Sequence, residues 1–232
     1  MATIALVHGA CHGAWCWDRL TPELVARGHE VITMDLPGDD GSATFDDYAD
    51  VVCEAVSNTD DELILVGHSM GGQTIPLVAA RRPVRRLVYL CALIPIPGQP
   101  LSRQLADDTA MLNPDYSKGL SETDIEGRRT WVDMDVARAH LFGDCDDELT
   151  SRALARLCPQ ALHPYRVPCS LKDFPDVPST YVLCTEDRMV NAAWSRRVAP
   201  ERVNAAVLEL PGSHSPFLSR PAQLADLLDT LA

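Results

Sequence analysis

The stretch LILVGHSMGG at residues 63–72 decides the fold of this chain. Its apolar start, Leu63 to Val66, predicts a buried strand, and the segment from Gln73 to Ala80 predicts a helix. Between them Ser69 stands in a Gly-x-Ser-x-Gly pattern, which at a strand-to-helix turn is typical of a nucleophile elbow. So tight a turn needs glycines on both sides, because larger side chains would clash with the strand and the helix. The stretch therefore predicts a nucleophilic serine.

A serine hydroxyl needs a base to take its proton and a third group to hold that base in the useful tautomer. His214 follows the last predicted strand, in a loop of small residues. Asp187 follows the fifth predicted strand, and the order serine, aspartate, histidine is usual in proteins with such an elbow. Glu186 is the rival acid, but its longer side chain and its position favour Asp187. We predict a catalytic triad of Ser69, His214 and Asp187.

Hydrogen-bond donors must also point at the negative charge that develops on the attacked oxygen. The first strand ends in Val7-His8-Gly9-Ala10, and the glycine lets this loop fold close to Ser69. The elbow geometry then predicts an oxyanion hole made by the backbone N–H groups of Ala10 and Met70.

Other residues near these motifs are predicted to pack, to brace a loop or to line a pocket. His12 is predicted to brace the Ala10 loop, and His68 either lines the pocket or packs. Trp15 and Trp17 are expected to pack under the first helix. The candidate pocket walls farther along the chain are Met111, Trp131, Leu141 and Phe142.

Short apolar runs alternate with segments of helical period along most of the chain, which indicates βα units around a parallel sheet. The predicted strands cover residues 4–7, 30–34, 63–66, 87–93, 180–184 and 206–210. The predicted helices cover residues 18–27, 45–57, 70–80 and 222–231. A single α/β domain with six strands follows.

Residues 95–178 break this alternation, because they contain no convincing strand and begin with closely spaced prolines. Ser121 with Asp124 suits a helix start, and residues 147–157 place apolar side chains on one helical face. We predict a helical cap, residues 97–178, inserted after the fourth strand. It would lie over the carboxyl edge of a core formed by residues 1–96 and 179–232.

The composition excludes several kinds of partner. The chain has 20 Lys and Arg against 33 Asp and Glu, a net charge of −13 that disfavours nucleic acid and anionic membranes. Its eight cysteines are scattered without metal-ligand spacing, so no metal site is indicated. The opening residues lack a leader pattern, and no long apolar run follows. The expectation is therefore a cytoplasmic protein with reduced thiols.

A family resemblance rests on four separated places: LVHGACHGAWCW at residues 6–17, GHSMGG at 67–72, CTED at 184–187 and His214. There the chain resembles small α/β-hydrolases that include plant methyl esterases and hydroxynitrile lyases. The resemblance spans nearly the whole chain. It implies the α/β-hydrolase fold with a helical cap, carboxylic-ester hydrolysis without a cofactor, a small-molecule ester substrate, and often a homodimer.

Two departures separate this chain from the lyases, which have threonine at the position of Gly9 and lysine at that of Ser215. Cyanide elimination needs the lysine charge to stabilise the leaving anion, so its absence favours an esterase. Two alternatives stay open because fold alone does not fix the reaction. One is a receptor-like protein that binds a small hydrophobic ligand with little turnover; the other is a lyase or carbon–carbon bond-cleaving enzyme.

Overall fold

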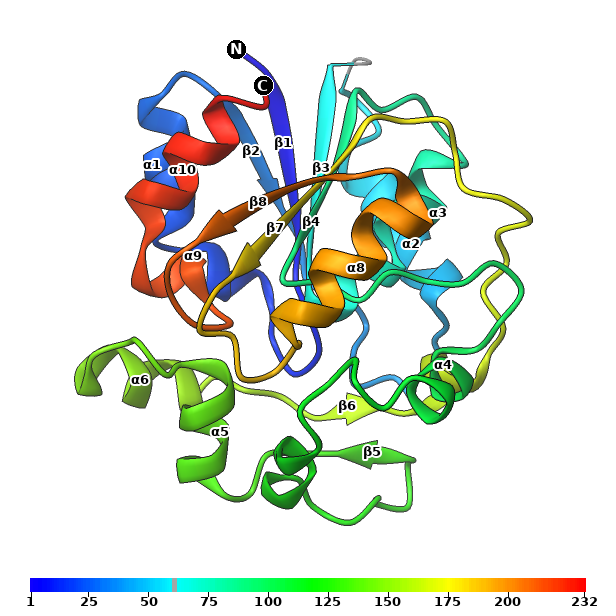
Figure 1. Ribbon diagram of the computed structural model, residues 1–232, viewed down its shortest axis with the longest axis vertical. Helices are drawn as coiled ribbons and strands as arrows, with labels where there is room; N and C mark the ends of the chain where they lie inside the picture. The colour runs from blue at the N-terminus through cyan, green and yellow to red at the C-terminus, as the bar shows by residue number, and fades with distance from the viewer. Residues whose placement is uncertain (60–61) are drawn as a thin grey trace.

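A six-stranded parallel sheet forms the centre of the computed structural model, which describes residues 1–59 and 62–232 (Figure 1). The strand order is β2-β1-β3-β4-β7-β8. The bounds are β1 Thr3–Val7, β2 Glu30–Thr33, β3 Leu63–His68, β4 Arg86–Leu90, β7 Ser179–Cys184 and β8 Ala206–Leu210. The predicted α/β-hydrolase sheet with flanking helices is confirmed, although β4 ends three residues earlier than predicted and β3 two residues later.

Successive side chains of the inner strands point to opposite faces of the sheet, and both faces are buried. Ala5, Leu65 and Tyr89 belong to one apolar cluster, which also contains side chains of the helices on that face. Ile4 and Val66 belong to the other cluster, with side chains of the helices on the opposite face. Burial on both sides explains why these strands read as continuous apolar runs.

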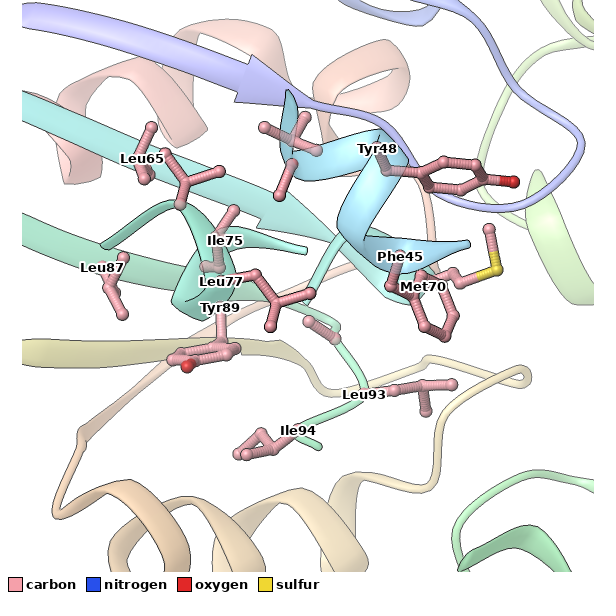
Figure 2. Close-up of a cluster of buried hydrophobic side chains, with 14 of the residues drawn as sticks. Phe45, Tyr48, Leu65, Met70, Ile75, Leu77, Leu87, Tyr89, Leu93 and Ile94 are labelled. Carbon is pink, nitrogen blue, oxygen red and sulfur yellow. The ribbon is translucent and has the colours of Figure 1, made fainter. Parts of the chain in front are cut away.

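The covering helices lie on the two sides of the sheet (Figure 1). Their bounds are α1 Leu20–Ala26, α2 Phe45–Ala55, α3 Ile75–Ala79, α8 Ala192–Val203, α9 Pro216–Ser219 and α10 Pro221–Asp229. Thr44 begins α2 with a capping box, in which the Asp47 N–H donates to Thr44 Oγ1 (3.2 Å) and the Thr44 N–H donates to Asp47 Oδ2 (2.7 Å). Figure 2 shows the buried cluster on this side, where Phe45 and Tyr48 of α2 lie near Met70.

The segment between β4 and β7 lies at the carboxyl ends of the strands (Figure 1). It holds α4 Leu101–Asp107, the 3₁₀ helix η3 Pro114–Gly119, β5 Arg128–Arg129, α5 Met134–Leu141, α6 Asp147–Leu154, β6 Gln160–Ala161 and α7 His163–Arg166. The segment is mainly helical, as expected, but β5 and β6 form a small antiparallel pair that the sequence did not indicate. Strands of two residues are too short to show an alternating pattern.

The helix predicted to start at Ser121 is wrong. Ser121 Oγ donates to the Glu122 carbonyl and accepts the Thr130 N–H, while the Asp124 carboxylate accepts the N–H groups of Glu126 and Arg128. The same short polar side chains that cap helices also close turns. Here they form a loop that leads into β5.

The connections of β1 and β3 leave the sheet in opposite directions. The chain runs from β1 outward to β2, then returns to β3 on the other side of β1 and continues to β4. In open α/β sheets, the crevice at the carboxyl ends of two such strands is the usual ligand site. We therefore expect a ligand site between the loops that follow β1 and β3.

None of the helices in the described ranges is long enough to cross a lipid bilayer. The longest of them, α8, has 12 residues, whereas a crossing takes about 20.

Candidate active site

Ser69 sits at the turn between β3 and the following helix, in a left-handed conformation with φ of 51°. The turn continues as a 3₁₀ helix, η2 Ser69–Gln73, before α3 begins, so the predicted helix has two parts. A left-handed backbone costs about 1–3 kcal/mol in a residue other than glycine, and surrounding contacts must offset it. One such contact is the Leu93 N–H, which donates to the Ser69 carbonyl at 2.9 Å. The serine thus has the strained geometry of a nucleophile elbow.

The glycines around Ser69 allow backbones to approach closely. A Cβ on Gly67 would lie 2.8 Å from the Gly71 carbonyl oxygen, and one on Gly71 would lie 2.6 Å from that of Val7. A Cβ on Gly72 would overlap the Leu93 carbonyl. The motif predicts that these positions need glycine, and at each of them a nearby backbone carbonyl leaves no room for a side chain.

Replacing Gly71 with alanine is expected to lower the free energy of unfolding by about 1–3 kcal/mol. The added Cβ would meet the carbonyl oxygens of Val7 and His8, and backbone at the end of a central strand cannot move aside easily. Urea denaturation followed by circular dichroism measures the change. Gly143→Ala is the control, since Gly143 is exposed and its nearest neighbour would be 3.4 Å away. Equal stability of both variants would contradict this explanation.

His214 and Asp187 form a buried hydrogen-bonded pair at the ends of β8 and β7. The distance from His214 Nδ1 to Asp187 Oδ2 is 2.9 Å, and the two side chains are only 1% and 2% exposed. Because a carboxylate can only accept, Nδ1 carries the hydrogen and Nε2 is free to take a proton. Asp187 Oδ1 accepts the N–H groups of Met189 (2.7 Å) and Val190 (3.0 Å). These three bonds hold the carboxylate in one orientation.

Glu186, the rival acid, lies elsewhere. Its residue is exposed, and its backbone N–H donates to the Gly212 carbonyl at 3.0 Å, which fixes the loop after β7 against the loop after β8. The side-chain partner of His214 is Asp187.

The loop after β1 approaches the elbow at Gly9, where a Cβ would lie 2.8 Å from Ser69 Cβ. His12 Nδ1 donates to the Ala10 carbonyl at 2.8 Å, so this histidine does brace the loop as expected. His8 braces it from the other side, with Nδ1 donating to the Gly9 carbonyl at 2.9 Å. Within the described ranges, the N–H groups of Ala10 and Met70 donate no hydrogen bond to another part of the protein. Both are thus available to a ligand.

His68 is fully buried beneath the elbow. Its Nε2 donates to the carbonyl of His214 at 3.0 Å, and its ring lies 4.6 Å from the His214 ring between centroids. Trp17 is also buried and packs against Phe217, whereas Trp15 is partly exposed and stacks on His12 at 5.4 Å. These aromatic rings fix the position of the His214 loop.

Burial lowers the pKa of His8, His12 and His68, to about 3 in the case of His12, because a buried imidazolium loses its hydration. The folded protein keeps these rings neutral at pH values where the unfolded chain, with an ordinary pKa near 6.5, takes up protons. Stability should therefore be unaffected by them above about pH 6.5 and should fall as the pH drops from there, by up to about 1.4 kcal/mol per pH unit for each histidine.

Urea denaturation between pH 7.5 and 4.5 measures this loss. His12→Gln, which removes one of the buried imidazoles, is expected to show a shallower decline than wild type. The exposed His163→Gln serves as control, and a slope for H12Q no shallower than for H163Q would contradict the assignment.

A cavity of about 310 Å³ opens beside Ser69 and His214. No hydrogen bond joins these two residues among those described, but catalytic pairs often tighten only when substrate binds. Of the predicted walls, Trp131 and Leu141 line the cavity, while Met111 and Phe142 are buried in the apolar clusters. The walls that sequence reasoning missed include Tyr116, Arg129, Gln160, Tyr165 and Arg166.

One group of possible metal ligands occurs in the described part of the chain: atoms of Cys91, Asp187 and His214 lie within 4.8 Å of one another. Asp187 and His214 are already bonded to each other. Burial raises the pKa of the Cys91 thiol, which disfavours the thiolate that a metal would need. The group is better explained as a hydrogen-bonded pair of Asp187 and His214 beside a buried thiol.

Comparison with known proteins gives a consistent result. A family model described as "Alpha/beta hydrolase family" matches residues 4–227. A pyrethroid hydrolase of Sphingobium wenxiniae is 29% identical, covering 99% of this chain and 87% of that protein, and methylesterase 9 of Arabidopsis thaliana is 27% identical, covering 100% and 98%. The crystal structure of a pyrethroid hydrolase from Sphingobium faniae superimposes with a TM-score of 0.85 at 25% identity, covering 99% of this chain and 96% of that one.

Proposed function

Because this chain belongs to the alpha/beta hydrolase family, we propose that it is a serine esterase, a carboxylic-ester hydrolase whose triad is Ser69, His214 and Asp187. The observation that carries the proposal is the buried bond from His214 Nδ1 to Asp187 Oδ2 (2.9 Å), with His214 facing the same cavity as Ser69. Its relatives named pyrethroid hydrolase and methylesterase support ester hydrolysis as the reaction.

In the proposed reaction, His214 Nε2 takes the hydroxyl proton of Ser69 as Oγ attacks the ester carbonyl. The tetrahedral oxyanion accepts hydrogen bonds from the N–H groups of Ala10 and Met70, which have no other acceptor among the described residues. His214 then gives the proton to the leaving alcohol, and an acyl-enzyme on Ser69 remains. Water activated by the same histidine releases the acid, while Asp187 holds the ring in place.

The lyase alternative loses support at Gly9. A threonine there, as in the lyases, would place its Cβ 2.8 Å from Ser69 Cβ, so this loop has no room for it. The position after the histidine holds Ser215, whose buried hydroxyl carries no charge for a leaving anion.

We further propose that residues 97–178 act as the cap of a core formed by residues 1–96 and 179–232, since many cavity walls come from this segment. The eight cysteines are all unpaired, which fits the reducing cytoplasm that the sequence predicts. A homodimer stays a prediction from the family resemblance.

Two measurements on the purified wild-type protein test the function. Hydrolysis of p-nitrophenyl acetate, butyrate and octanoate is expected, with a preference that reports the size of the cavity. A fluorophosphonate should add once to the intact protein, and peptide mapping should place the adduct on Ser69. Labelling of Ser69 without turnover of these esters would mean a competent triad that acts on a different substrate. Absence of both turnover and labelling would favour the receptor-like alternative, and an adduct on another residue would refute the triad.

A further inference from the structure

The walls of the cavity carry an unusual charge pattern for so acidic a chain. The protein has a net charge of −13, yet no aspartate or glutamate in residues 1–59 and 62–232 lines the cavity. Its lining includes two arginines, Arg129 and Arg166, among mostly apolar and aromatic side chains. Two cations at the walls of this cavity point to an anionic ligand, because they make the electrostatic potential there positive in an otherwise acidic protein.

Neither arginine has a carboxylate partner within the described ranges. Arg129 Nε donates to the Ser121 carbonyl at 2.7 Å, which leaves its terminal amino groups unused. Arg166 is exposed at the rim of the cavity, and its side chain makes no hydrogen bond or ion pair with any residue that the structure describes. In contrast, Arg128, the neighbour of Arg129 on β5, pairs with Asp124 (3.0 Å) and Glu126. Consecutive residues of a strand point to opposite sides, so Arg128 pairs with these two carboxylates whereas Arg129 lines the cavity.

The position of Arg129 relative to the reacting atoms follows from the small sheet. Arg129 is paired directly with Gln160 of β6. The buried Gln160 Oε1 accepts the N–H of Cys11 at 3.4 Å, one residue beyond Ala10 of the proposed oxyanion hole. Paired residues of an antiparallel ladder lie about 4.5–5.5 Å apart between Cα atoms. Arg129 is thus tied to the loop that would hold the ester carbonyl.

Tyr116 lies in the same cavity wall as Arg129. Burial raises the pKa of the Tyr116 hydroxyl, and the positive charge of Arg129 opposes that rise. Both side chains line the same space.

We propose that the substrate is an anionic ester, namely the half-ester of a short dicarboxylic acid, whose free carboxylate binds Arg129 and Arg166. This inference rests on the proposed esterase function and specifies its substrate class. A guanidinium binds a carboxylate through two parallel hydrogen bonds, which fixes orientation as well as charge. Ser69 lines the same cavity as both arginines, so the ester end of such a substrate can reach it while the carboxylate is bound.

The test compares esters of matched size that differ in charge. Monomethyl succinate and methyl 4-oxopentanoate have the same number of heavy atoms, but only the first carries a carboxylate. We expect wild type to hydrolyse the anion with a kcat/KM at least tenfold higher, and the difference should shrink between 0.05 and 0.5 M salt because ions screen the attraction. Monomethyl glutarate with methyl 5-oxohexanoate repeats the comparison one carbon longer.

Variants of the two arginines test which side chains cause the preference for the anionic ester. Arg129→Gln and Arg166→Gln should each lower kcat/KM for the anionic ester about tenfold, mainly through KM, as the loss of about 1.4 kcal/mol of binding requires. The ratio of kcat/KM for the anionic ester to that for the neutral ester should fall, since the neutral ester has no carboxylate for either arginine to bind. Arg152→Gln removes the same charge from an exposed position on α6, paired with Glu148, and should alter neither substrate.

Different failures have different meanings. If wild type hydrolyses neutral and anionic esters equally at both chain lengths, or if both arginine variants keep the wild-type preference, the inference is wrong and the esterase function stands. If wild type hydrolyses none of these esters or the p-nitrophenyl esters and takes no fluorophosphonate label, the proposed function itself fails.

Discussion

Replacing Ser69 with alanine is expected to reduce kcat by about 10⁴-fold or more for every ester that wild type hydrolyses. The change removes the oxygen that attacks the carbonyl and becomes acylated, and no other group lies at the elbow to replace it. The small residual rate would come from the remaining hydrogen-bond donors and from substrate binding. Initial rates at saturating p-nitrophenyl ester measure the loss.

The variant should stay folded, because alanine is smaller than serine and the Leu93 N–H still donates to the backbone carbonyl of residue 69. Ser151→Ala, on an exposed turn of α6, is the control and should keep full activity. The fluorophosphonate adduct should be absent from S69A and present in S151A. Wild-type turnover by a folded S69A protein would rule out Ser69 as the nucleophile.

Replacing Asp187 with asparagine is expected to lower kcat by about 10⁴-fold while the fold is retained. An amide nitrogen facing His214 Nδ1 would donate to it, so the proton would move to Nε2 and the ring could no longer accept the proton of Ser69. Asparagine can still accept the N–H groups of Met189 and Val190 through its oxygen. The effect should therefore appear in kcat and leave the free energy of unfolding close to that of wild type.

Glu186→Gln is the matched control, one residue away and exposed. It should keep kcat within about threefold of wild type, since its side chain takes no part in the pair with His214. A large loss in E186Q together with a small one in D187N would reverse the assignment. The double variant S69A/D187N should be no slower than S69A alone, because the residues of a triad act as one unit.

The sequence predicted those parts of the fold in which local pattern and tertiary environment agree. The inner strands are buried on both faces, so Leu63 to Val66 shows up as a plain apolar run. The elbow is specified within six residues, because Gly67, Gly71 and Gly72 all meet backbone that leaves no space for a side chain. Asp187 and His214 could be located because each lies in the loop that follows a predicted strand, three residues after β7 and four residues after β8.

The walls of the cavity could not be predicted in the same way. Arg129 and Gln160 meet through strands of two residues, too short to leave a periodic signal, and they are 31 positions apart in the chain. The polar pattern at Ser121 and Asp124 suited a helix start but closes a loop instead. Met111 and Phe142 are apolar residues of the kind that line pockets, yet their side chains are buried in the two apolar clusters.

The separation of the proposed triad from most of the cavity walls has an evolutionary consequence. Ser69, Asp187 and His214 come from loops that follow β3, β7 and β8, whereas Tyr116, Arg129 and many other walls come from the continuous segment between β4 and β7, the proposed cap insertion. Mutations in that insertion can therefore alter which compounds are accepted without passing through inactive intermediates. A lineage built this way can acquire new substrates rapidly while its reaction stays constant, and recombination of the insertion alone would transfer selectivity between enzymes.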